Sequence, residues 1–136
     1  MILGIPNPEL WMEAGDWVSY EVTHIFPLSS GSIWNRRGYG RFITDMNESP
    51  QAFRINSPQN GFVLKSGVHQ RFDQYLISVN PDDGYKVVAV GFDGDGLDSR
   101  ILDPVCRDPS NPHRICDLVL RWHFRQAVLM NVKGTM

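Results

Sequence analysis

The sequence has only two cysteines among its 136 residues, Cys106 and Cys116, and so contains no disulfide framework. We therefore predict an intracellular protein of a reducing compartment, without distinguishing nucleus from cytoplasm. The chain also lacks any run of about 20 apolar residues, the length that a membrane-spanning helix requires. Residues 1–6 lack the basic start and the apolar core of a secretion signal.

A strong positive charge is missing as well, because the formal net charge is −2. The molecule as a whole does not attract nucleic acid, so any phosphate binding must come from local clusters or a bound metal ion. With 42% hydrophobic residues, the chain can form one domain with a core. We assign this domain to residues 17–134. Residues 1–16, rich in proline, glycine and acidic residues, are expected to be a partly disordered N-terminal extension.

Residues 60–73 carry the clearest chemistry in the chain. A short apolar run predicts a strand, and Ser66 lies at the position of a helix N-cap. The helix that follows carries His69 and Asp73, four residues apart. Residues four apart share a helix face, so this face presents an imidazole beside a carboxylate. Such a pair can hold a divalent cation or form a charge-assisted hydrogen bond.

A second histidine, His24, lies in a segment dominated by aromatic and β-branched residues, 17–26, which is predicted to be a strand. Apolar and polar residues alternate along this strand, which places His24 on the apolar face together with Val22. Taken alone, His24 is best interpreted as a hydrogen-bonded core histidine. Together with residues 60–73 it is better interpreted as part of an active site.

His24, Asn60 and His69 stand in the order of the HNH motif, in which a histidine, an asparagine and a second histidine surround one metal ion. The phrases His-Ile-x-Pro, Asn-Gly-x-x-Leu, His-x-x-Phe-Asp and Trp-His-Phe-Arg-Gln resemble a fungal branch of this nuclease family, also called ββα-metal. The resemblance extends over residues 7–134. It implies an α+β fold with a ββα-metal core, an additional β-hairpin and a C-terminal packing helix.

By this resemblance the chain is a metal-dependent endonuclease that hydrolyses phosphodiester bonds of DNA. His24 would act as the general base, and His69 and Asp73 would hold one divalent ion, either Mg²⁺, Mn²⁺ or Zn²⁺. Asn60 would orient the loop or form a hydrogen bond with the base.

The residue before the catalytic histidine departs from the family pattern. Many HNH nucleases have an aspartate or histidine ligand there, whereas this chain has Thr23. Glu21 shares its strand face with Thr23 and could replace the missing ligand only through a water molecule. A second hypothesis therefore stays open: a catalytically weak or inactive HNH-like domain that acts as a nucleic-acid- or protein-binding module.

Three arginines, Arg36, Arg37 and Arg41, cluster in the long connection between the two motif segments, residues 28–59. They are candidates for contacts with the substrate phosphate, and equally for a solvated basic surface. A connection this long without secondary structure would be unusual, so part of it should be a short helix.

Three further elements are predicted after the motif. Residues 76–91 should form a β-hairpin around the turn sequence at 81–84. The acidic stretch at 93–98 is predicted to be a turn rather than a calcium loop, because it lacks the closing glutamate. Residues 117–132 should form a helix that closes the core.

In that last helix, Leu118, Trp122 and Leu129 lie along one apolar stripe. We expect Trp122 to anchor the helix on the core and His123 to be structural or exposed. Four possible zinc ligands stand in this third of the chain: Cys106, His113, Cys116 and His123. Structural zinc sites bring their ligands in close pairs, a spacing that only His113 and Cys116 have, so such a site is disfavoured.

Overall fold

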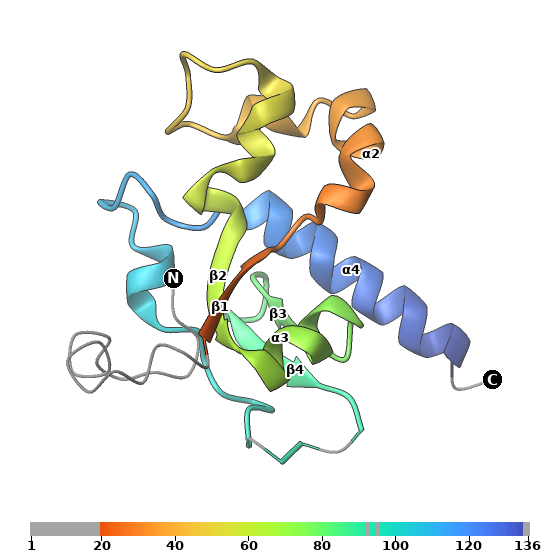
Figure 1. Ribbon diagram of the computed structural model, residues 1–136. Coiled ribbons are helices and arrows are strands. Elements are labelled where there is room, and N and C mark those ends of the chain that lie inside the picture. The colour runs from red at the N-terminus through yellow and green to blue at the C-terminus, as the bar shows by residue number, and fades with distance from the viewer. Residues whose placement is uncertain (1–19, 92, 95, 135–136) are drawn as a thin grey trace.

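A computed structural model describes residues 20–91, 93–94 and 96–134. Two small antiparallel sheets and several helices make a mixed α and β fold (Figure 1). The predicted N-terminal extension, 1–16, and the first residues of the predicted strand at 17–26 lie outside the described residues.

The first sheet is a two-stranded ribbon formed by β1 (Tyr20–His24) and β2 (Gly61–Lys65). The helix α3 (Ser66–Asp73) follows β2 directly. The second sheet is a hairpin of β3 (Ile77–Asn80) and β4 (Lys86–Ala89). Two strands, a helix and a further hairpin therefore occur in the predicted order.

The start of α3 differs from the prediction. Lys65 occupies the N-cap position without a side-chain cap, and Ser66 is already the first helical residue. The helix ends at Asp73, because Tyr75 adopts a left-handed backbone conformation with φ of 61°. Val68 and Phe72 are buried in the core, which leaves His69 and Asp73 on a more exposed face.

The connection between β1 and β2 contains short helices, as expected. These are η2 (Leu28–Ser30), α2 (Gly31–Arg36), η3 (Tyr39–Phe42), η4 (Gln51–Asn56) and η5 (Pro58–Asn60). Trp34 of α2 is buried and meets Phe26 edge to face, with ring centroids 5.2 Å apart. The guanidinium of Arg54 donates hydrogen bonds to three backbone carbonyls of this region, which holds η4 in place.

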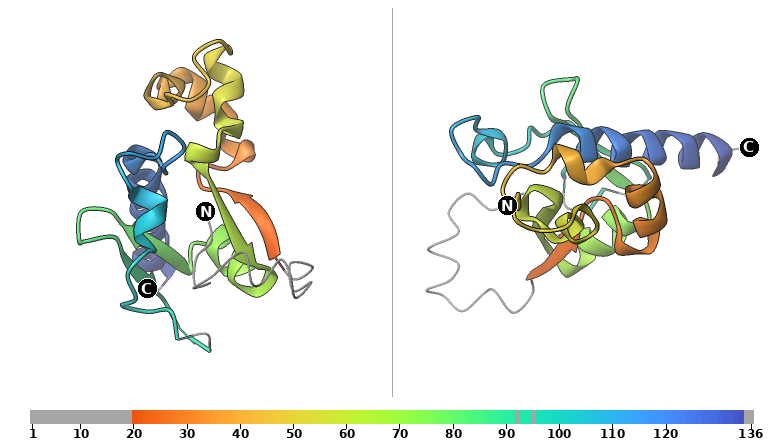
Figure 2. Two further views of the ribbon diagram at one scale, coloured as in Figure 1. Left: turned by 90° about the vertical axis from the view of Figure 1, so that its left-hand side faces the viewer. Right: turned by 90° about the horizontal axis from the view of Figure 1, so that it is seen from above.

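The helix α4 (Asp117–Gly134) follows a loop that contains η6 (Pro104–Arg107) and packs mainly against β3. In the left view of Figure 2, α4 lies on the opposite side of the molecule from β1. Its buried side chains are Val119, Leu120, His123 and Ala127. No helix in the described part of the chain is both long and apolar enough to cross a membrane.

The predicted apolar stripe of α4 is confirmed at Trp122, which packs against the core, and is wrong at Leu129. Leu129 is 49% exposed and Trp122 is only partly buried, although its ring stacks on Phe26 with centroids 4.1 Å apart. His123 is the side chain that faces the interior. His123 has hydrogen-bond partners on β3 and at the end of α3, whereas Leu129 points to solvent.

Candidate active site

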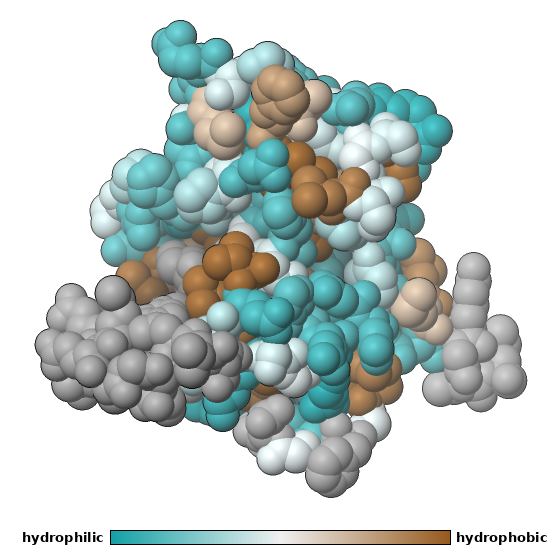
Figure 3. Space-filling view, in the orientation of Figure 1, coloured by the Kyte–Doolittle hydropathy of each residue, from teal (hydrophilic) through white to brown (hydrophobic). Residues whose placement is uncertain are grey.

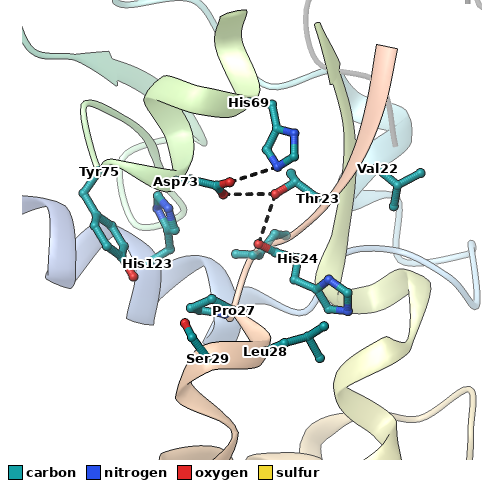
Figure 4. Close-up of a pocket in the computed structure, with 11 residues that line it drawn as sticks. Val22, Thr23, His24, Pro27, Leu28, Ser29, His69, Asp73, Tyr75 and His123 are labelled. Carbon is teal, nitrogen blue, oxygen red and sulfur yellow. Dashed lines mark hydrogen bonds and ion pairs between the residues drawn. The ribbon is translucent and has the colours of Figure 1, made fainter. Parts of the chain in front are cut away.

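A cavity of about 490 Å³ opens beside the end of β1 (Figure 4). His24 of β1 and His69 and Asp73 of α3 all line it. The fold therefore brings together three of the residues that the motif predicts, from two elements about 45 positions apart in the chain.

His69 lies between two carboxylates. Its Nε2 atom is 3.0 Å from Oδ2 of Asp73, and its Nδ1 atom is 3.7 Å from Oε1 of Glu21. The hydroxyl of Thr23 donates to Oδ1 of Asp73 at 3.2 Å. Glu21, Thr23, His69 and Asp73 thus form one group of polar side chains, which we call the His69 cluster. Thr23, at the position of the missing ligand, orients the Asp73 carboxylate.

The imidazole of His24 points away from the His69 cluster (Figure 4). Its Nε2 atom lies 2.9 Å from Oδ1 of Asn56 in η4. The rings of His24 and His69 therefore do not face each other. The two histidines share the cavity, but His24 stands at its edge with its ring on the other face of the ribbon.

The reason lies in the pairing of β1 with β2. Thr23 is paired with Phe62, and directly opposed residues of antiparallel strands share a face. Phe62 is fully buried, so Thr23 is turned inward, to 3% exposure, and Val22 is left 74% exposed. His24 shares the outer face with Val22, and the prediction that this is the buried face was wrong. A hydrophobic patch is visible over the ribbon in Figure 3.

Asn60 is completely buried, and its side chain makes three hydrogen bonds with the backbone. Oδ1 accepts from the N–H of Phe26 at 2.7 Å, and Nδ2 donates to the carbonyls of Phe26 at 3.0 Å and Ile55 at 2.8 Å. The backbone carbonyl of Asn60 also accepts from Ile25. These contacts orient the loop after β1, and none of them reaches the imidazole of His24.

The spacing of His69 and Asp73 suits a pair of ligands to one divalent ion. Adjacent ligands of an octahedral Mg²⁺ lie about 3 Å apart, because each is about 2.1 Å from the ion. The 3.0 Å between His69 Nε2 and Asp73 Oδ2 fits such a pair as well as it fits a hydrogen bond. Within residues 20–91, 93–94 and 96–134, no group of three or more His, Cys, Asp or Glu could hold a metal ion. An ion at His69 and Asp73 would therefore take two such ligands from the described residues and have further positions open to water or substrate.

The three predicted phosphate contacts are not brought to the cavity. Arg36, Arg37 and Arg41 are all exposed, and none of them lines it. The guanidinium of Arg41 lies over the ring of Phe42, 4.7 Å from its centroid. A role for these arginines in contacting a longer substrate stays a prediction.

His123 forms part of the cavity floor and is a structural residue. Its ring stacks on Phe72, with centroids 3.7 Å apart and planes at 9°. Nδ1 lies 2.7 Å from the hydroxyl of Ser78, and Nε2 lies 3.0 Å from the carbonyl of Phe72. Burial lowers the pKa of His123 from 6.5 to about 4, so the ring is neutral at pH 7. A neutral imidazole donates through one nitrogen and accepts through the other, which satisfies both contacts.

Residues 1–80 match the family model described as HNH endonuclease. The match covers more than half of the 136 residues. The chain belongs to the HNH endonuclease family. No curated protein and no solved structure matches it. Membership implies a nucleic-acid substrate, and the closer resemblance to a fungal branch stays a prediction.

Within this HNH endonuclease domain, Asn56 is the neighbour of His24 that sequence reasoning missed. It stands outside the motif, in a connection whose local pattern shows only short helices. Asn56 could be recognised only from the contact between η4 and the end of β1, and the order of residues in the sequence does not reveal that contact. The position of Glu21 beside His69 follows more simply, because Glu21 and Thr23 share a strand face.

Proposed function

We propose that this HNH family member is a metal-dependent endonuclease that hydrolyses phosphodiester bonds of DNA. The observation that carries the proposal is the shared cavity of His24, His69 and Asp73 in a chain of this family. A general base and a pair of metal ligands at one opening are the groups that phosphodiester hydrolysis requires.

His69 and Asp73 are the residues that would hold the ion, Mg²⁺, Mn²⁺ or Zn²⁺. When bound, a divalent ion supplies positive charge to the phosphate and to the leaving oxygen. Thr23 restrains one oxygen of Asp73, and Glu21 faces the far nitrogen of His69 at 3.7 Å. Such outer contacts fix the orientation of metal-binding side chains. They are the protein's own contribution to the geometry of the site.

His24 is proposed to remove a proton from the attacking water. The His24 ring lies on the opposite face of β1 from the His69 cluster. The phosphate would therefore lie across the end of β1, between His24 and the His69 cluster. No arginine lines the cavity, and the exposed residues at its mouth include the aliphatic Val22 and Leu28. Neither feature provides direct recognition of bases, so we expect cleavage with little sequence specificity.

Nicking of a supercoiled plasmid tests this function, in Mg²⁺, Mn²⁺ or Zn²⁺ and with a chelator as the control. His69→Ala should lose metal binding, measured by calorimetry, together with nicking, because it removes a ligand. His24→Ala should keep metal binding and lose about 10²–10⁴-fold in rate, because it removes only the base. Gln70→Ala, an exposed neighbour on α3 that does not line the cavity, is the matched control and should retain both.

Two results would overturn these assignments. If the wild-type protein binds DNA but does not nick it with any of the three ions, the domain is a binding module. If His24→Ala and His69→Ala lose the ion equally, His24 is a ligand and the base lies elsewhere.

A further inference from the structure

The hydrogen bond between His24 and Asn56 has a chemical direction. The amide oxygen of Asn56, which lies 2.9 Å from Nε2 of His24, can only accept. The proton of a neutral His24 ring therefore belongs on Nε2, and the lone pair is left on Nδ1. The partner of one ring nitrogen decides which tautomer is present, and so which nitrogen can act as a base.

We propose that Asn56 is a positioning residue of this site, which fixes His24 as the Nε2–H tautomer and makes Nδ1 the proton acceptor. The catalytic consequence of this assignment rests on the proposed nuclease function. The tautomer itself does not, because it follows from the contact between two side chains of the free protein.

Asn56 can fix a ring because its own backbone is held on both sides. Ile55 before it is buried, and its carbonyl accepts from Asn60 at 2.8 Å. Ser57 after it is also buried, and its hydroxyl accepts from the N–H of Gln59 at 3.0 Å and donates to Asp45. The backbone of Asn56 is therefore fixed in position, and its exposed side chain is oriented by the hydrogen bond to His24 itself.

The amide of Asn60 joins the two segments that meet at this contact. It binds both backbone groups of Phe26, two residues after His24, and the carbonyl of Ile55, one residue before Asn56. The end of β1 and the end of η4 are therefore held at a fixed separation by one buried side chain. Asn60 holds the backbone of these two segments, and Asn56 orients the imidazole ring of His24.

The proton balance of the step is simple. A proton passes from the attacking water to Nδ1 of His24, which then carries N–H on both nitrogens as an imidazolium. The water oxygen forms the new bond to phosphorus, the bond from phosphorus to the leaving oxygen breaks, and the leaving oxygen takes a proton from solvent water. The Asn56 carbonyl keeps its hydrogen bond to Nε2–H throughout, and that bond becomes stronger when the ring is charged.

The tautomer can be measured without metal or DNA, by long-range ¹H–¹⁵N correlation spectra of the histidine rings at a pH where His24 is neutral. The wild-type protein should show Nε2–H for His24. Asn56→Asp, which keeps an acceptor oxygen, should show the same tautomer, and Asn56→Ala should show a mixture. Asn47→Ala changes an exposed asparagine outside the cavity and should match the wild type. An Nδ1–H ring in the wild type, or an unchanged tautomer in Asn56→Ala, would overturn the proposal.

Plasmid nicking gives the second measurement. Asn56→Ala should lower kcat by about 10–100-fold, as removal of an orienting partner commonly does, and leave KM for DNA unchanged. Asn56→Asp should recover most of the rate. If Asn56→Ala nicks at the wild-type rate, the assignment of Asn56 fails while the nuclease function stands. If the wild-type protein does not nick at all, the nuclease function fails, and the spectra still decide the tautomer.

Discussion

His123 is a buried ionisable side chain beneath the cavity, and its titration should be visible in the stability of the protein. Its pKa is lowered by burial from 6.5 to about 4. Below pH 6.5 His123 binds a proton in the unfolded chain but not in the folded protein. The free energy of unfolding therefore falls as the pH is lowered, until the pH reaches about 4. The loss should approach about 3 kcal/mol at the acid end, since one pKa unit corresponds to about 1.4 kcal/mol.

Urea unfolding between about pH 7 and about pH 4.5 measures this slope. The matched variant is His123→Gln, which keeps a side-chain donor and an acceptor but cannot titrate in this range. Its stability should depend less steeply on pH than that of the wild type. Identical slopes in the two proteins would show that His123 binds its proton equally in the folded and unfolded chains.

Asn60 is expected to stabilise the fold rather than to take part in the reaction. Asn60→Ala leaves three buried backbone groups without partners, two on Phe26 and one on Ile55. Each unsatisfied group costs about 1–3 kcal/mol, so we expect a loss of at least about 3 kcal/mol in urea unfolding. Asn47→Ala, on an exposed loop, should stay within about 0.5 kcal/mol of the wild type. If both variants are equally stable, Asn60 does not hold the loop.

The helix α4 offers a comparison between two leucines. Leu120 is 1% exposed and belongs to the core, whereas Leu129 is 49% exposed. Leu120→Ala should cost about 2–5 kcal/mol and Leu129→Ala less than about 0.5 kcal/mol in urea unfolding. Trp122→Ala should lower the free energy of unfolding by less than the about 3–5 kcal/mol expected for a fully buried ring, because Trp122 is only partly buried. The opposite order for the two leucines would restore the stripe that the sequence predicts.

The elements β1, β2 and α3 show which features of an element a sequence can predict and which it cannot. Alternation correctly places Glu21 with Thr23, and helical spacing correctly places His69 beside Asp73. Neither pattern says which face of β1 turns inward, because that depends on the partner strand: Phe62 and Leu64 of β2 are both fully buried. The contact of His24 with Asn56 is hidden for the same reason. Periodicity describes one element at a time, whereas packing depends on two.

The core of the whole domain extends beyond the part that the family model matches. The match ends at residue 80, yet Val87, Leu102, Val119 and Leu120 are buried with the residues of the motif. β4 also completes the sheet of β3, and α4 covers β3. A fragment of residues 1–80 should therefore show no cooperative unfolding by circular dichroism and no nicking. A fragment that unfolds cooperatively and nicks plasmid would show that residues 81–134 are dispensable.

The pairing of β1 with β2 joins segments separated by residues 25–60, while β3 and β4 are joined by a short turn. Closing a long loop costs more chain entropy than closing a short one, and pairings between distant segments form more slowly. The β3–β4 hairpin should thus be able to form early in the course of folding. The cavity, whose walls come from both sides of the long connection, should be assembled among the last parts. A chain stopped part-way would then hold a formed hairpin and no site, so a newly made molecule would acquire its chemistry only at the end of folding.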